Sequence, residues 1–138
     1  MHCHQAFTLI NKNLAVFSIT DFVGFGKLIE NSSADVSEYI TIVTGSNGTF
    51  ALKLTNKQAL IDLKNYIENP STNAEAEKSF NISIDNKMSV KDQIKGLLQF
   101  INETTPDGGI ELYQINNNNE WELKQLDDNN KVKSIKCS

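Results

Sequence analysis

The sequence predicts a single α+β domain spanning residues 1–138, with a mostly antiparallel sheet of about six to eight strands and two amphipathic helices packed on one face. Three observations predict this fold. Alternating apolar residues on both sides of Asn47-Gly48 indicate a β-hairpin. Apolar stripes at helical spacing follow that hairpin and, later, Ser89. The last third alternates again between turns rich in Asn and Asp. The predicted element order is ββ(α)ββ-α-β-α-βββ.

The N-terminal region predicts a first hairpin. Ala6–Ile10 and Leu14–Ile19 are short apolar runs on either side of Asn11-Lys12-Asn13. Both runs carry apolar residues on both faces, which is typical of strands in the middle of a sheet or under a helix. The following segment, Asp21–Ile29, fits either a short helix or a turn into a strand. Asn31-Ser32-Ser33 then interrupts regular structure.

The central region predicts a hairpin, a helix and a further strand. Ile40 and Ile42 share one strand face, and Phe50, Leu52 and Leu54 share one face of the next strand. Thr55 is expected to start a helix, because Gln58 stands at the capping-box position and a stripe of Leu60, Leu63 and Ile67 follows. Asn69-Pro70 should end it. Pro70–Lys78 is expected to be a polar connection, and the alternation of Phe80, Ile82 and Ile84 predicts a strand.

The C-terminal half predicts the second helix and the meander. Ser89 is expected to cap the helix, with Asp92 at the capping-box position, and Thr105–Gly109 should stop it. The strands are then expected at Ile110–Ile115, Glu120–Leu126 and Lys131–Cys137.

Charge and hydropathy exclude two classes of partner. The formal net charge is −4, the sequence pI is about 5.1, and every basic residue is Lys. An acidic chain without Arg is unsuited to nucleic acid or to an anionic membrane surface. Residues Ala6–Phe25 are apolar overall, but polar residues interrupt them, so neither a signal peptide nor a membrane span is expected.

Two cysteines, Cys3 and Cys137, stand at opposite ends of the sequence. The termini of compact domains often lie close together, so we expect these cysteines to form a disulfide. Such a bridge would contribute roughly 4–5 kcal/mol in the chain-entropy model. It also predicts a periplasmic or extracellular protein whose leader is absent from this sequence. The alternative is a pair of free thiols in a cytoplasmic protein.

Candidate motifs for metal, phosphate and catalysis are weak. His2-Cys3-His4 brings metal-ligand residue types together, but its spacing is too tight for a structural site, and the sequence has no other His. Val23-Gly24-Phe25-Gly26-Lys27 lacks the glycine spacing and the Ser or Thr of a P-loop. The carboxylates occupy predicted turns and polar faces rather than a paired arrangement for acid–base chemistry. We therefore expect no metal, no cofactor and no enzymatic activity.

Four residues are candidates for partner binding. Trp121 and Tyr113 stand on neighbouring predicted strands and could form an aromatic patch for a sugar or a protein. If the register instead separates their faces, Trp121 would be core and Tyr113 exposed. Asp127 and Asp128 form an acidic turn suited to a basic partner.

These observations favour a non-enzymatic, exported binding protein, with an inhibitor or immunity-type role against a secreted enzyme or toxin. The first alternative is a small-molecule or carbohydrate-binding domain that uses the concave sheet face beneath the helices. The second is an enzyme of unrecognised mechanism, with carboxylates that only folding brings together.

Overall fold

The computed structural model describes residues 8–10, 16–32, 40–45 and 48–137. Within these ranges the chain forms six strands and four helices. In chain order they are β1 (Thr8–Ile10), α1 (Ile19–Glu30), β2 (Ile40–Gly45), β3 (Gly48–Leu54), α2 (Lys57–Glu68), α3 (Asn73–Ser83), α4 (Val90–Thr104), β4 (Ile110–Ile115), β5 (Trp121–Leu126) and β6 (Val132–Lys136).

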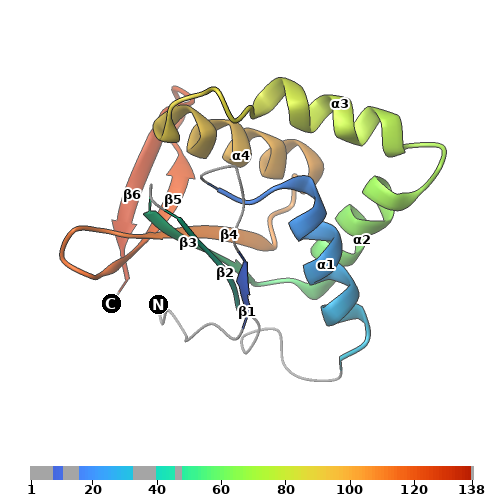
Figure 1. The fold of residues 1–138 in the computed structure, drawn as a ribbon, viewed down its shortest axis with the longest axis horizontal. Helices are drawn as coiled ribbons and strands as arrows, with labels where there is room; N and C mark the ends of the chain where they lie inside the picture. Colours follow the sequence, from blue (N-terminus) through green and yellow to red (C-terminus); the bar gives the residue numbers. More distant parts are fainter. Residues whose placement is uncertain (1–7, 11–15, 33–39, 46–47, 138) are drawn as a thin grey trace.

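The strands form one sheet in the order β1-β2-β3-β4-β5-β6 (Figure 1). Strands β2 to β6 are antiparallel neighbours, and the short β1 adds to the β2 edge in parallel. The predicted α+β class with an antiparallel sheet is therefore confirmed, as are the hairpin β2–β3 and the C-terminal meander. Asn47 of the predicted hairpin turn lies outside the described residues.

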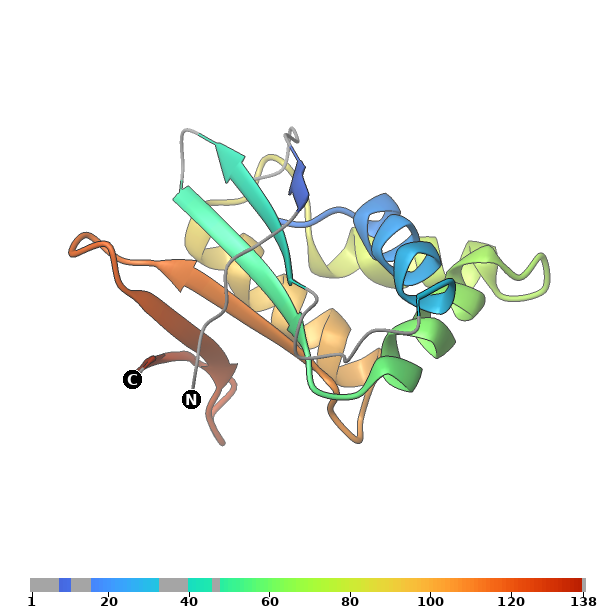
Figure 2. The same cartoon turned by 90° about the horizontal axis from the view of Figure 1, so that it is seen from below.

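The helices gather on one side of this sheet (Figure 2). The main core lies between them and the sheet, because Phe50, Leu52 and Leu54 of β3 point toward the helices and are almost fully buried. Helices α1 and α2 pack closely together, and α3 packs on α2 and α4. A second, smaller cluster of Ile40, Ala51, Tyr113 and Leu123 occupies the opposite face.

The two helices predicted from apolar stripes are confirmed, with one shifted start. Asn56 rather than Thr55 caps α2, since its Oδ1 accepts a hydrogen bond of 3.0 Å from the Gln58 N–H. Ser89 caps α4 as expected, and its Oγ accepts a hydrogen bond of 3.1 Å from the Asp92 N–H. The number of helices was underestimated, because α1 and α3 add to these two.

The prediction of a strand at Leu14–Ile19 is wrong in its described part, because Ile19 begins helix α1. Residues 11–15, the predicted hairpin turn among them, lie outside the described residues. The helix starts where it does because the Asp21 carboxylate accepts hydrogen bonds from Ser18, at 2.8 Å from its N–H and 3.0 Å from its Oγ. The ambiguous segment Asp21–Ile29 is therefore helical.

The prediction of a polar connection followed by a strand at Phe80–Ile84 is also wrong. Residues Asn73–Ser83 form α3, which buries Ala76 and Phe80 and ends against a buried Ile84. These three residues are four apart, so they fit one helix face as well as Phe80, Ile82 and Ile84 fit one strand face. The preceding AEAEK run consists of strong helix formers and is the signal that the sequence reading missed.

Candidate functional site

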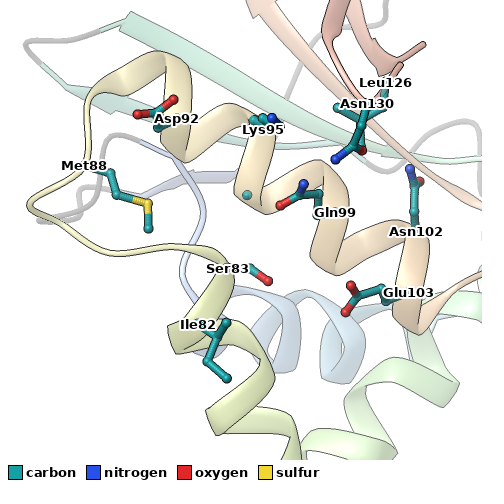
Figure 3. A pocket seen from close by; sticks show the side chains of 11 residues that line it. Ile82, Ser83, Met88, Asp92, Lys95, Gln99, Asn102, Glu103, Leu126 and Asn130 are labelled. Carbon is teal, nitrogen blue, oxygen red and sulfur yellow. The ribbon is translucent and has the colours of Figure 1, made fainter. Parts of the chain in front are cut away.

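A groove of about 600 Å³ lies beside α4, bounded by the C-terminal end of α3 and by the β5–β6 turn (Figure 3). We call it the α3–α4 groove. Its lining residues are Ile82, Ser83, Met88, Asp92, Lys95, Gly96, Gln99, Asn102, Glu103, Leu126 and Asn130.

Helix α4 supplies most of the groove because its two faces differ. Ile94, Leu97, Leu98 and Ile101 are buried in the core. The lining side chains of α4 recur at intervals of three or four residues on another stripe. Figure 3 shows Asp92 near one end of this stripe and Glu103 near the other, with Lys95 and Gln99 between them. The groove is thus lined by charged and amide groups along a rigid helix.

Gly96 allows the end of α3 to approach α4 closely. A Cβ added to this buried glycine would lie 1.8 Å from the carbonyl oxygen of Ser83. Only a residue without a side chain fits against that carbonyl. The contact positions Ile82 and Ser83 at the edge of the groove.

The groove also has an apolar end, formed by Ile82 and Met88. Ile82 is 69% exposed, more than any other large hydrophobic residue in the part of the chain that the structure describes. Met88 is half-buried in the loop between α3 and α4. Its carbonyl accepts a hydrogen bond of 3.0 Å from the amide of the buried Gln93, which holds this loop against α4.

The predicted acidic turn, Asp127-Asp128, borders the groove through Leu126 and Asn130. The Asp127 carboxylate accepts hydrogen bonds from the backbone N–H groups of Asn129 and Lys131, at 2.8 and 2.9 Å, so it shapes the turn. Asn130 adopts a positive φ of 61° in the same turn. Asp128 is exposed. Of the two predicted carboxylates, Asp128 is the one presented to solvent.

Tyr113 and Trp121 lie on the same face of the sheet, which is the face opposite the helices. Tyr113 pairs with Leu123 and is only 2% exposed, whereas Trp121 pairs with Ile115 and is half-buried. The register therefore places the two aromatic residues together but leaves Tyr113 no room for an external partner. The alternative in which Trp121 is core and Tyr113 exposed is wrong. Partner binding by Trp121 stays a prediction.

Burial is the main cause of a raised pKa at the Tyr113 hydroxyl, and the neighbouring Glu111 carboxylate adds to it. This hydroxyl donates a hydrogen bond of 3.0 Å to Glu111 Oε1. A raised pKa means that the folded protein keeps the proton when the unfolded chain loses it, near pH 10. The stabilisation from Tyr113 is thus complete below about pH 10 and is lost as the pH rises further.

We expect stability to fall less steeply above about pH 10 in Tyr113→Phe than in the parent protein. Urea unfolding at a series of alkaline pH values measures this difference. Tyr66→Phe is the comparison variant: the pKa of the Tyr66 hydroxyl is also raised, but its side chain is more accessible, so its effect should be the smaller of the two. Parallel stability curves for the parent and Tyr113→Phe would contradict the prediction.

The predicted disulfide is only partly placed, since Cys3 lies outside the described residues, as do His2 and His4. Cys137 directly follows β6, and its N–H donates a hydrogen bond of 3.0 Å to the carbonyl of Trp121. Its side chain is half-buried against the cluster on the helix-free face. The Cys3–Cys137 pairing stays a prediction.

No group of three or more His, Cys, Asp or Glu side chains in the described part of the chain is arranged to hold a metal ion. None of the described helices has the length and apolar character needed to cross a membrane. Comparison with protein-family models, with curated proteins and with solved structures finds no match for this chain.

Proposed function

We propose that this protein is a non-enzymatic binding protein, exported and closed by a Cys3–Cys137 disulfide, that contacts a protein partner through the α3–α4 groove. In this proposal it acts as an inhibitor or immunity-type protein against a secreted enzyme or toxin. The observation that carries the proposal is Ile82, an apolar side chain left 69% exposed on a regular helix. With the half-buried Met88 it gives the groove an apolar end rimmed by polar residues, and an apolar patch with a polar rim is a feature of protein-contact surfaces.

The polar lining indicates the chemistry of the partner. Among the described residues that line the groove, Asp92 and Glu103 supply carboxylates and Lys95 supplies an ammonium group. The exposed Asp128 stands next to the lining residues in the β5–β6 turn. An excess of carboxylates would attract a basic surface and repel an acidic one. The partner should therefore present an apolar residue to Ile82 and Met88, surrounded by Lys or Arg.

The rigid walls of the groove support a role in binding rather than in catalysis. Its walls are a 15-residue helix capped at Ser89 and the end of a second helix held at Gly96. A surface that is already ordered loses little conformational entropy when it binds. Such a surface suits a protein that blocks another by contact.

A pull-down from the secretome of the native source tests this proposal. The parent protein should retain a basic secreted protein, and Ile82→Glu should lose it. Ile135→Glu is the matched control, since Ile135 is also exposed, at 43%, but lies on β6 and is not part of the groove lining. Recovery of background proteins alone by the parent protein would defeat the proposal.

Charge reversal examines the basic character of the partner. Glu103→Lys should weaken capture, whereas Glu77→Lys should not, because Glu77 is an exposed α3 residue outside the groove lining. Equal capture by both charge variants would contradict the predicted basic contact. Equal capture by the two isoleucine variants would mean that the partner binds a different surface.

A further inference from the structure

Strands β4 and β5 part at one end of the sheet. Their pairing runs from Ile115↔Trp121 to Leu112↔Lys124 and stops there. Strand β4 nevertheless continues beside β3 to Ile110↔Leu54, and β5 continues beside β6 to Leu126↔Val132. The first residues of β4 and the last residues of β5 therefore remain strand while lying apart from each other.

A cavity of about 450 Å³ lies where these strands part, and α4 closes it from the helical side. We call it the β4–β5 cavity. Its lining is mixed. The apolar residues are Leu98 and Ile101 of α4 and Ile110, Leu112, Leu123 and Leu126 of the sheet, and the polar residues include Thr55, Asn102, Asp107 and Gln125. A volume of this size is within the range of small-molecule sites, roughly 300–1,000 Å³. Elsewhere, buried side chains of β3 fill the space between the sheet and the helices.

The strand ends bring peptide groups to this cavity. The N–H of Asp127 donates to the carbonyl of Lys131 across the β5–β6 hairpin. Peptide groups of an antiparallel strand alternate in direction, so the N–H of Leu126 points the other way, toward β4. The next rung of the β4–β5 ladder would join it to the carbonyl of Ile110, and that rung lies beyond the observed register. The same rung would join the Ile110 N–H to the Leu126 carbonyl, so the donor and the acceptor of each residue are directed to the space between the strands.

Three charged residues among those described line the cavity: Lys124 and Glu111 are already engaged, and Asp107 is exposed to solvent. Lys124 Nζ donates to Ser134 Oγ at 2.6 Å and to Glu122 Oε1 at 3.4 Å. The Glu111 carboxylate accepts the hydrogen bond from Tyr113 on the other face of the sheet. A neutral ligand therefore fits this lining better than a charged one, because it leaves these interactions intact.

We propose that the β4–β5 cavity binds a small neutral molecule that combines an apolar body with an amide group. The apolar body packs on Leu98, Ile101 and Leu112. The amide carbonyl accepts from the Leu126 N–H, and the amide N–H donates to the Ile110 carbonyl, which completes the missing rung. This site is independent of the proposed protein contact, although Asn102 and Leu126 line both cavities.

Titration with N-acetyl-leucinamide, followed by two-dimensional amide NMR of the full chain, tests the site. The backbone signals of Ile110 and Leu126 should shift in a saturable way. Acetamide has the polar group without the apolar body, so it should produce shifts at least about tenfold weaker at equal concentration. Shifts confined to other residues, or equal shifts with acetamide, would overturn the proposal.

Two substitutions at Leu126 separate the role of the cavity from that of the side chain. Leu126→Trp should fill the space and weaken binding at least about tenfold. Leu126→Ala keeps the backbone groups and enlarges the space, so it should still bind. Unchanged binding by Leu126→Trp, or its loss in a folded Leu126→Ala, would count against this location. Partner capture through Ile82 is measured separately, so either proposal can fail alone.

Discussion

Gly96→Ala is expected to lower the free energy of unfolding by about 3 kcal/mol, the upper part of the range for overpacked cores. The new Cβ would lie 1.8 Å from the Ser83 carbonyl oxygen and 2.8 Å from its carbon. Both atoms belong to the backbone, so no side-chain rotation relieves the overlap, and α3 must move away from α4. The effect runs against helix propensity, which favours Ala over Gly by about 1 kcal/mol.

Gly24→Ala is the matched control, because Gly24 lies in α1 and a Cβ there meets nothing within 4 Å. We expect this variant to be at least as stable as the parent protein. Urea unfolding of both variants measures the difference. If Gly96→Ala matched the stability of Gly24→Ala, the close approach of α3 and α4 would be wrong. The same displacement should weaken partner capture, since Ile82 and Ser83 would leave their places at the groove.

Phe100→Ala is expected to cost about 3–5 kcal/mol of stability, as large-to-small changes of buried aromatic residues do. Phe100 is fully buried, and its ring centroid lies 5.9 Å from that of Phe22 and 5.1 Å from that of Phe80. It therefore joins α4 to α1, which the sequence left ambiguous, and to α3, where the sequence predicts a connection and a strand. Removing the ring leaves a cavity among three helices, and none of them can close it without disturbing its other contacts.

Phe100→Leu is the milder control, with an expected loss of about 1–2 kcal/mol because most of the apolar volume remains. A double-mutant cycle of Phe80→Ala and Phe100→Ala should give a coupling energy of about 0.5–1.5 kcal/mol for the edge-to-face pair. Chemical denaturation of the four proteins provides the values. Additive losses would show that Phe80 does not pack on Phe100, and the placement of α3 would then be wrong.

Local patterns in the sequence were sufficient for the elements whose apolar residues repeat regularly. Helices α2 and α4 each carry an apolar stripe with a period near 3.6, and the strands of the hairpin β2–β3 and of the C-terminal meander alternate with a period of 2. Ser89 and the Asn- and Asp-rich turns also act through hydrogen bonds within a few residues. Such signals are complete within a short window and can be read without the rest of the chain.

Local sequence patterns predict only part of the candidate groove. The acidic turn at Asp127-Asp128 was identified and does border the groove. The alternation of Phe80, Ile82 and Ile84, however, predicts that Ile82 lies on the buried face of a strand, and the carboxylates of α4 fit the polar face of a helix. The groove depends on the contact between Gly96 of α4 and Ser83 of α3, which are 13 residues apart in the sequence. A pattern within one element carries no information on such a contact.

The sequence by itself determined the α+β class, the antiparallel hairpins and the helices that carry a clear apolar stripe. Tertiary structure decided the state of residues whose patterns fit both a helix and a strand. Phe80 and Ile84 satisfy either period, and the packing of Phe80 on Phe100 selects the helix. Tertiary structure also decided that β1 joins β2 in parallel and that β4 and β5 separate at one end. The physical reason is that these choices depend on contacts between distant segments, whose energies exceed local preferences that are nearly balanced.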